Sequence, residues 1–304
     1  MTGKPRLTAR DFDPEVLRLF DQYVHGDIDR RGFLSGTARI AGGMAAATGL
    51  LALLAPRFAA AQQVKPDDPR IQASTLGFDS PEGNGKASGY LVRPAGAGGK
   101  APVVLVVHEN RGLNPHIEDV ARRFATEGYI AFAPDALFPL GGYPGEEDAA
   151  RAEFAKLDQA KAKQDFLAAA KLLKEIDGGN GRLGATGFCW GGGMTHWLAT
   201  QLGNSLDAAA PFYGPAPAPE EASKVKAELL VVQAADDERV NKTWPPYETA
   251  LKEAKVEYAL YQPEGTQHGF HNDTTPRYDE AAAKEAWKRT LALFDRRLRK
   301  AGAA

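Results

Sequence analysis

Short β-branched runs alternate with longer helical patterns through the last two thirds of the chain, and this alternation constrains the fold more than any other feature. Residues 102–108, PVVLVVH, form a continuous apolar run of the kind found in a parallel strand that is covered on both faces. Further strands are expected at 129–133, 183–188, 206–214, 228–236 and 256–262, and helices at 116–127, 148–175, 191–201, 244–254 and 279–298. The pattern predicts an α/β fold with a mostly parallel central sheet, right-handed crossovers and helices on both faces.

An antiparallel hairpin is expected before this alternation begins. Residues 87–94, ASGYLVRP, alternate in polarity as a strand does, and the flanking GNGK and AGAGGK segments have turn composition. No internal repeat or long linker interrupts residues 62–304, whose length suits a single domain. We therefore expect one α/β domain over residues 62–304.

The composition excludes several classes of site. One cysteine in 304 residues rules out an intramolecular disulfide and a zinc or iron–sulfur site built from cysteine pairs. The formal net charge of -2 gives no electrostatic reason to expect a nucleic-acid or anionic-membrane partner. Since HExxH or comparable ligand spacing is also absent from the sequence, we expect neither a metal nor a cofactor.

Residues 1–61 have the features of a twin-arginine signal peptide. Arg30 and Arg31 precede an aromatic residue and a leucine, an uncharged run covers residues 40–55, and small residues end at Ala61, where cleavage is expected. The uncharged run is short and rich in Ala and Gly, so we expect no stable membrane anchor. The prediction is a partner in the twin-arginine export machinery and a periplasmic or secreted location. The alternative is a cytosolic protein with a loose N-terminal helix.

The single cysteine lies between a predicted strand and a predicted helix. Cys189 has Gly187 two residues before it and Gly191 two residues after it, which is the spacing of a nucleophile elbow. Glycine is needed at both places because the turn is tight enough for side chains to collide with the neighbouring strand and helix. A helix N-terminus adds roughly half a positive charge, which favours a thiolate. The alternative is that Cys189 is a small buried hydrophobic residue.

An elbow predicts an acid and a histidine later in the chain, in that order. Asp236 and Asp237 end one predicted strand, and His268 follows the next. The imidazole would hold the thiol proton and the carboxylate would fix its tautomer, although either aspartate could instead only cap a helix. His25 is set aside with the signal peptide, and structural or surface roles are expected for the remaining histidines: His108, His116, His196 and His271.

Four separated motifs resemble the dienelactone hydrolase family of α/β-hydrolases: residues 106–135, GFCWGGG at 187–193, DERV at 237–240 and HGFHND at 268–273. The resemblance implies an α/β-hydrolase fold that cleaves a small ester or lactone, of the carboxymethylenebutenolidase type, through a thioester. It matches Cys189, Asp237 and His268 to the family's triad, since the family aspartate lies three residues before a valine, as Asp237 lies before Val240. It also matches Glu109 to a glutamate that pairs with the resting thiol until substrate displaces that contact.

Two backbone N–H groups and two arginines complete the expected site. In a nucleophile elbow the residue after the nucleophile donates its backbone N–H to the oxyanion, which indicates the amide of Trp190. The amide of Asn110 is the second candidate. Arg111 and Arg277 could hold a substrate carboxylate, although surface arginines are commonly only solvated. The substrate itself is expected to be a small-molecule ester or lactone.

Aromatic residues at the ends of predicted strands could wall the pocket. Phe212 and Tyr213 are the candidates, together with Trp190, and core packing explains them equally well. A general carboxylesterase is the nearest alternative function. A non-catalytic binding or thiol-redox protein is the alternative from another class, because a fold does not specify an activity.

Overall fold

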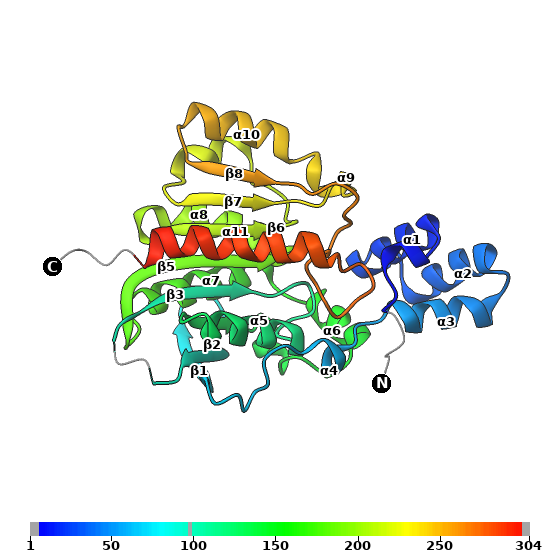
Figure 1. The fold of residues 1–304 in the computed structure, drawn as a ribbon, viewed down its shortest axis with the longest axis horizontal. Coiled ribbons are helices and arrows are strands. Elements are labelled where there is room, and N and C mark those ends of the chain that lie inside the picture. Colours follow the sequence, from blue (N-terminus) through cyan, green and yellow to red (C-terminus); the bar gives the residue numbers. More distant parts are fainter. Residues whose placement is uncertain (1–5, 97–98, 300–304) are drawn as a thin grey trace.

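The computed structural model describes residues 6–96 and 99–299, and a mixed sheet of eight strands forms the centre of this described part (Figure 1). The sheet order is β1-β2-β4-β3-β5-β6-β7-β8, with β1–β2 and β2–β4 antiparallel and the other neighbouring pairs parallel. The strands are β1 (Ile71–Ser80), β2 (Gly85–Pro94), β3 (Ala101–Val107), β4 (Ile130–Pro134), β5 (Gly179–Phe188), β6 (Ala208–Phe212), β7 (Glu228–Val232) and β8 (Tyr258–Tyr261). The predicted fold class and the N-terminal hairpin are confirmed.

Helices cover both faces of the sheet because the central strands are apolar on both faces. Helices α5 (Pro115–Thr126) and α11 (Glu280–Leu298) pack on one face, and α7 (Gln159–Lys174), α8 (Trp190–Leu202) and α10 (Trp244–Glu253) on the other. In β3, Val103, Leu105 and Val107 point into the core beneath α7 and α8. Val104 and Val106 point toward α5 and α11. All five side chains are fully buried, which explains the uninterrupted apolar run.

One predicted helix is two helices in the structure. The segment expected to be helical over residues 148–175 divides into α6 (Glu147–Phe154) and α7, because Asp158 caps the second helix by accepting from the backbone N–H groups of Ala160 and Lys161. The Ala- and Lys-rich composition gave no sign of this break. The remaining short elements are α9 (Glu238–Asn241) and the 3-10 turns η1 (Ala9–Asp11), η2 (Phe138–Leu140), η3 (Gly203–Ser205) and η4 (Pro219–Lys224).

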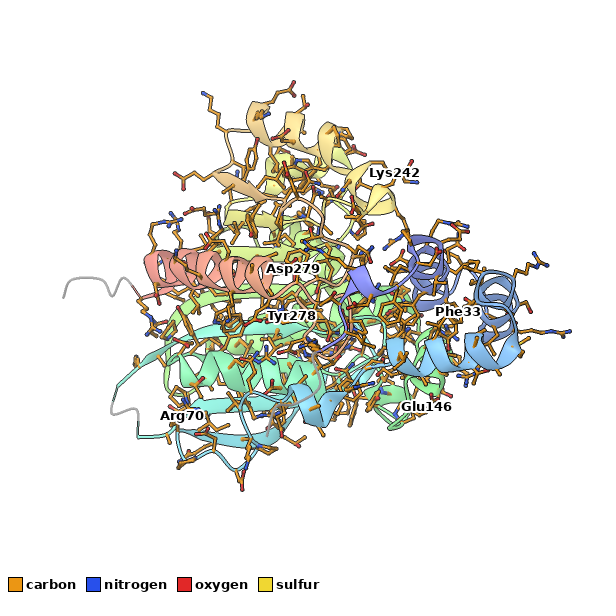
Figure 2. All side chains as sticks on the ribbon, turned by 45° about the vertical axis from the view of Figure 1, so that its right-hand side comes forward. Phe33, Arg70, Glu146, Lys242, Tyr278 and Asp279 are labelled. Atoms are coloured by element: carbon orange, nitrogen blue, oxygen red, sulfur yellow. The ribbon has the colours of Figure 1, made fainter. Side chains whose placement is uncertain are left out.

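The N-terminal segment folds into a helical bundle at the carboxyl ends of the parallel strands (Figure 1). We call residues 6–61 the cap and residues 62–299, as described, the main domain. The cap contains α1 (Pro14–His25), α2 (Arg30–Ala41), α3 (Met44–Leu54) and α4 (Phe58–Ala61). Helices α1, α2 and α3 enclose a small apolar core of their own, with Phe33 fully buried inside it, whereas α4 contacts α5 of the main domain. Figure 2 labels Phe33 in the cap and Glu146 in the main domain.

One window of the described residues is long and apolar enough to cross a membrane, judged by length and composition only. It covers Met44–Ala61, with a mean hydropathy of 1.5 and 17% of the window buried. A signal sequence near the N-terminus meets the same criterion, so the finding is weak support for a membrane span. In the structure Pro56 and Arg57 separate α3 from α4 within this window.

The chain enters the main domain through a well-anchored connection. The backbone N–H of Val64 donates to Asp119 Oδ1 at 2.8 Å, and its carbonyl accepts from Arg122 Nε at 2.7 Å. Gln63 Nε2 donates to Asp273 Oδ2 at 2.7 Å. These contacts show that residues from Gln63 onward are held by the main domain independently of the cap.

Candidate active site

Cys189 sits at the bend between β5 and α8 in a backbone conformation that side chains rarely adopt. Its φ is 57° and its ψ is -114°. A Cβ added at Gly187 would lie 2.3 Å from the carbonyl oxygen of Gly191, and one at Gly191 would lie 2.5 Å from the carbonyl oxygen of His108. Both neighbours are backbone atoms that cannot move aside, so the two glycines are required by the close approach of strand, turn and helix.

Asp237 and His268 form a buried hydrogen-bonded pair beside this bend. His268 Nδ1 donates to Asp237 Oδ2 at 2.6 Å, since an ionised carboxylate can only accept. Asp237 Oδ1 also accepts from the backbone N–H of Val240 at 3.2 Å, so the residue caps α9 as well. Asp236 is exposed, whereas Asp237 is buried. With Nδ1 engaged, the Nε2 atom of His268 is left to face the thiol, and the two atoms lie within 4.8 Å of each other.

The charges around Cys189 favour a thiolate. Burial raises the pKa of the thiol, but the neighbouring imidazole groups of His268 and His25 lower it by more, to about 5. Burial lowers the pKa of His268, while the thiolate and the Asp237 carboxylate raise it to about 10. At neutral pH the arrangement therefore favours a thiolate–imidazolium pair, as in other sites where a cysteine meets a cationic histidine.

A second imidazole lies in the site, and it comes from the segment expected to be a signal peptide. His25, at the end of α1, has its Nε2 atom 3.5 Å from Cys189 Sγ and 3.2 Å from His268 Nε2. Its Nδ1 atom donates to the carbonyl oxygen of Asp21 at 2.8 Å, so Nε2 is the acceptor nitrogen. Arg239 Nη2 donates to that nitrogen at 2.8 Å. No motif in the sequence links His25 to Cys189, because the contact depends on how the cap docks.

His25, Cys189 and His268 lie close enough together that their possible binding of a metal ion has to be tested. The ligand atoms of His25, Cys189 and His268 all lie within 4.8 Å of one another. A cation at this point would need the lone pair of His25 Nε2, which already accepts from the Arg239 guanidinium. It would also lie against that positive charge. The residues as arranged therefore do not fit a metal ion.

Glu109 does not hold the thiol in this structure. Its Oε2 atom accepts from Asn272 Nδ2 at 3.1 Å, while the side chain that contacts Cys189 Sγ, at 3.5 Å, is His25. The resting contact between Glu109 and the thiol that the family resemblance implies is thus replaced by a contact with the cap. Asn272 lies four residues after His268 and was not singled out from the sequence, since an amide in a polar loop carries no distinctive signal.

The loop after β3 presents Asn110 and Arg111 to the cap. Asn110 Nδ2 and Arg111 Nη2 both donate to the carbonyl oxygen of Val24, at 3.0 and 3.1 Å. Trp190 is the first residue of α8, where backbone N–H groups have no partner within the helix. The oxyanion roles of the Trp190 and Asn110 amides stay predictions.

A cavity of about 340 Å³ lies between the cap and the main domain, next to Cys189 and His268. Arg111 and Arg277 line it, as expected, but each already faces a carboxylate. Arg111 Nε lies 3.5 Å from Glu147 Oε2, and Arg277 Nη1 lies 3.2 Å from Asp21 Oδ1. The other lining residues include Glu109, Asn110 and Asn272 from the main domain and Phe20, Tyr23, Val24, Leu51 and Phe58 from the cap.

The aromatic pocket walls expected from the sequence belong to the core instead. Phe212 and Tyr213 are each 1% exposed, and neither lines the cavity that contains Cys189. Phe212 packs against Phe188, and Tyr213 packs against the ring of His268 with a centroid separation of 4.9 Å. Tyr213 therefore helps to hold the His268 ring in place by packing against it. Trp190 also lies outside the lining and stacks on His108.

Three comparisons with known proteins relate the main domain to the same protein family. The model of the Dienelactone hydrolase family matches residues 87–298, and a model described as YqhI-like matches residues 4–42. A putative carboxymethylenebutenolidase of Escherichia coli K12 is 32% identical over 246 residues, which cover 75% of this chain and 88% of that protein. The crystal structure of a putative dienelactone hydrolase from Klebsiella pneumoniae is 29% identical, with a TM-score of 0.63, and covers 73% of this chain and 98% of that one.

Proposed function

Since the chain belongs to the dienelactone hydrolase family and is thereby a hydrolase of ester bonds, we propose that Cys189 is its nucleophile and that it works through a thioester. The observation that carries the proposal is the hydrogen bond of 2.6 Å between His268 Nδ1 and Asp237 Oδ2. This bond leaves His268 Nε2 facing a thiol that the strained elbow holds at the head of α8. A nucleophile, a base and a group that orients the base are the parts that acyl transfer requires.

The proposed reaction proceeds in two halves. The Cys189 thiolate attacks the carbonyl carbon, and the carbonyl electron pair moves onto oxygen. When the tetrahedral intermediate collapses, the C–O bond of the ester breaks and the leaving oxygen takes the Nε2 proton of His268. Water then attacks the thioester while His268 accepts its proton, and the carboxylic acid leaves as Cys189 returns to the thiolate.

Backbone N–H groups would stabilise the oxyanion formed in each half. Trp190 and Asn110 are the proposed donors, because the first lies at the N-terminus of α8 and the second follows β3. Each such donor is worth about 3 kcal/mol of transition-state stabilisation. Asp237 would stabilise the imidazolium and fix the tautomer without taking the proton itself.

Small lactones or esters are the proposed substrates. Several relatives that match two thirds or more of the chain carry the name putative carboxymethylenebutenolidase, and the cavity of about 340 Å³ is of a size for a small molecule. Arg111 and Arg277 would be available to a substrate carboxylate once their present partners, Glu147 and Asp21, are exchanged.

Export by the twin-arginine route, with cleavage after Ala61, is also proposed. Arg30 and Arg31 followed by the apolar window that ends at Ala61 support it. The test is expression of the full chain with a C-terminal tag, followed by N-terminal mass analysis of the periplasmic fraction. Mature protein that begins near Gln62 and disappears when both arginines become lysine is expected. Periplasmic protein with an intact N-terminus would contradict cleavage.

The hydrolase test compares wild type with Cys189→Ala and Cys189→Ser on a panel of aryl esters and unsaturated lactones. We expect kcat/KM to fall by at least about a thousandfold in Cys189→Ala, as when other nucleophiles are removed. The matched control is His196→Gln against His268→Gln. Both histidines are buried, but His196 packs on Tyr247 away from the cavity. Measurable turnover that is equal in wild type and Cys189→Ala would contradict the proposal.

A further inference from the structure

The end of α1 occupies the polar groups of the main domain that surround the thiol. The carbonyl oxygen of Val24 accepts from the side chains of Asn110 and Arg111, at 3.0 and 3.1 Å. The next residue, His25, contacts Cys189 Sγ at 3.5 Å and His268 Nε2 at 3.2 Å. Val24 thus occupies two side-chain donors that can bind a carbonyl oxygen, and His25 contacts the two reacting atoms, Cys189 Sγ and His268 Nε2. A bound acyl substrate would need the same groups.

This arrangement conflicts with turnover. His268 Nε2 has to exchange a proton with the leaving group and with water, but that nitrogen faces His25 at hydrogen-bond distance. The two reacting side chains are also enclosed, since Cys189 is 7% exposed and His268 3%. The adjoining cavity leaves room beside the sulfur, yet it does not free the base. We propose that the cap is an intramolecular inhibitor, with Val24 and His25 as its plug, and that displacing or removing the cap opens the site.

Polar contacts at the cap's edge hold this plug in place. Asp21 accepts from Arg277 at 3.2 Å and orients His25 from the same helix. Tyr23 bonds to Asp148, and Arg57 donates its backbone N–H to the carbonyl of Thr274 at 2.9 Å. The apolar core of the cap, by contrast, is closed within its own helices. Release therefore exchanges polar contacts for water and leaves both cores intact.

The inhibitor depends on the proposed function only for the identity of the reaction that it blocks. If the cap is also the export signal, the chain would fold with its site closed and open only when the segment is cut off. Accessibility of the thiol can be measured without any substrate, so the two proposals can fail separately.

The experiment cuts the folded full chain between cap and main domain. A specific protease site is inserted between Ala61 and Gln62, where Gln62 is exposed and the anchored Gln63 and Val64 stay with the main domain. After cutting and gel filtration, the rate of Cys189 alkylation by iodoacetamide is compared in cut and uncut protein. We expect the cut protein to react at least about tenfold faster, as for a site released from a locally closed state. Equal rates would overturn the proposal.

A second comparison tests the plug without a cut. His25→Ala in the full chain removes the imidazole and keeps a strong helix former at the end of α1. Gln22→Ala on the same helix is the control, because its side chain is only half-buried and does not line the cavity. Alkylation and ester hydrolysis should both rise in His25→Ala and stay at the wild-type rate in Gln22→Ala. In the cut protein all three should react alike.

The combined alkylation and hydrolysis results distinguish the inhibitor proposal from the hydrolase mechanism. Faster alkylation of cut protein and of His25→Ala, with faster hydrolysis, supports both proposals. Faster alkylation with no hydrolysis by any form supports the inhibitor and contradicts the hydrolase mechanism. Slower hydrolysis in both His25→Ala and cut protein, with alkylation unchanged, would make His25 a working part of the site and overturn the inhibitor.

Discussion

The cap and the main domain are both folded around apolar cores, but they hold their functional residues in different ways. In the main domain, backbone atoms fix the position of Cys189, since a side chain at Gly187 or Gly191 would overlap carbonyl oxygens. In the cap, His25 reaches the same site from the last residue of α1 and depends on side-chain contacts such as that of Asp21 with Arg277. The first arrangement cannot change without unfolding, whereas the second can be lost by rigid-body movement.

The difference has an energetic basis. Charged contacts at a partly exposed edge contribute about 0–1 kcal/mol each, because both ions are well solvated when apart. Arg30 with Asp148 is such a contact, since the Arg30 side chain is 55% exposed. Burial of a core aromatic contributes several times more. The cap is thus expected to leave the main domain at a much smaller free-energy cost than either core would need to open.

The largest expected effect comes from adding one methyl group to a glycine in each region. Gly191→Ala should destabilise the main domain by about 3 kcal/mol or more, because its Cβ meets fixed backbone. Gly36→Ala in the cap should change stability by about 1 kcal/mol or less, since the Cβ meets only the flexible end of Leu19, at 2.9 Å, and alanine favours the helix. Urea unfolding measures both. Equal effects would remove the contrast between the regions.

The next effect separates the two cores. Phe33→Ala should cost the cap about 3–4 kcal/mol, because Phe33 is fully buried among α1, α2 and α3. Phe294→Ala should cost the main domain a similar amount. Calorimetry should show that Phe33→Ala lowers the Tm of a cap transition only and speeds alkylation of Cys189. A single transition that shifts equally in both variants would mean that the regions unfold together.

The pH dependence is a smaller effect with a definite sign. The thiolate of Cys189 is lost as pH falls through its pKa of about 5, which His268 and His25 hold down against burial. His25→Gln should raise this midpoint, because one of the two lowering groups is gone while His268, Asp237 and Arg239 remain. Thiolate absorbance against pH, with Cys189→Ala as blank, measures it. From the sequence alone, a neutral histidine base predicts that kcat/KM falls on the acidic side at about pH 6–7. The ion pair of Cys189 and His268 moves this fall in kcat/KM to lower pH. An unchanged midpoint in His25→Gln would place His25 outside the field of the thiol.

The smallest effect concerns one contact at the cap's edge. Tyr23→Phe removes the hydrogen bond to Asp148 and keeps the ring that packs on Phe20 and Phe33. The loss of about 1 kcal/mol should increase Cys189 alkylation a few-fold in the uncut chain and not at all in the cut chain. An increase in both would assign the effect to the main domain.

The sequence predicted the parts of the site that local chemistry determines. The glycines around Cys189, and the aspartate and histidine that follow successive strands, could be found because strand ends meet at one edge of the sheet. The break between α6 and α7 and the fully buried Phe212 could not be found, since helix composition and aromatic strand ends fit either outcome. His25 could not be found because it lies 164 residues from Cys189 and its contact depends on cap docking.

Acyl-enzyme formation at Cys189 is the decisive test of whether this thiol is the nucleophile and whether the cap blocks it. Cut and uncut protein are mixed with an aryl ester, quenched and analysed by peptide mass mapping. We expect an added acyl mass on the peptide that contains Cys189, formed faster after the cap is cut away and absent in Cys189→Ala. Turnover by cut protein with the acyl group on another residue, or with none on Cys189 under conditions where the thioester should accumulate, would contradict it.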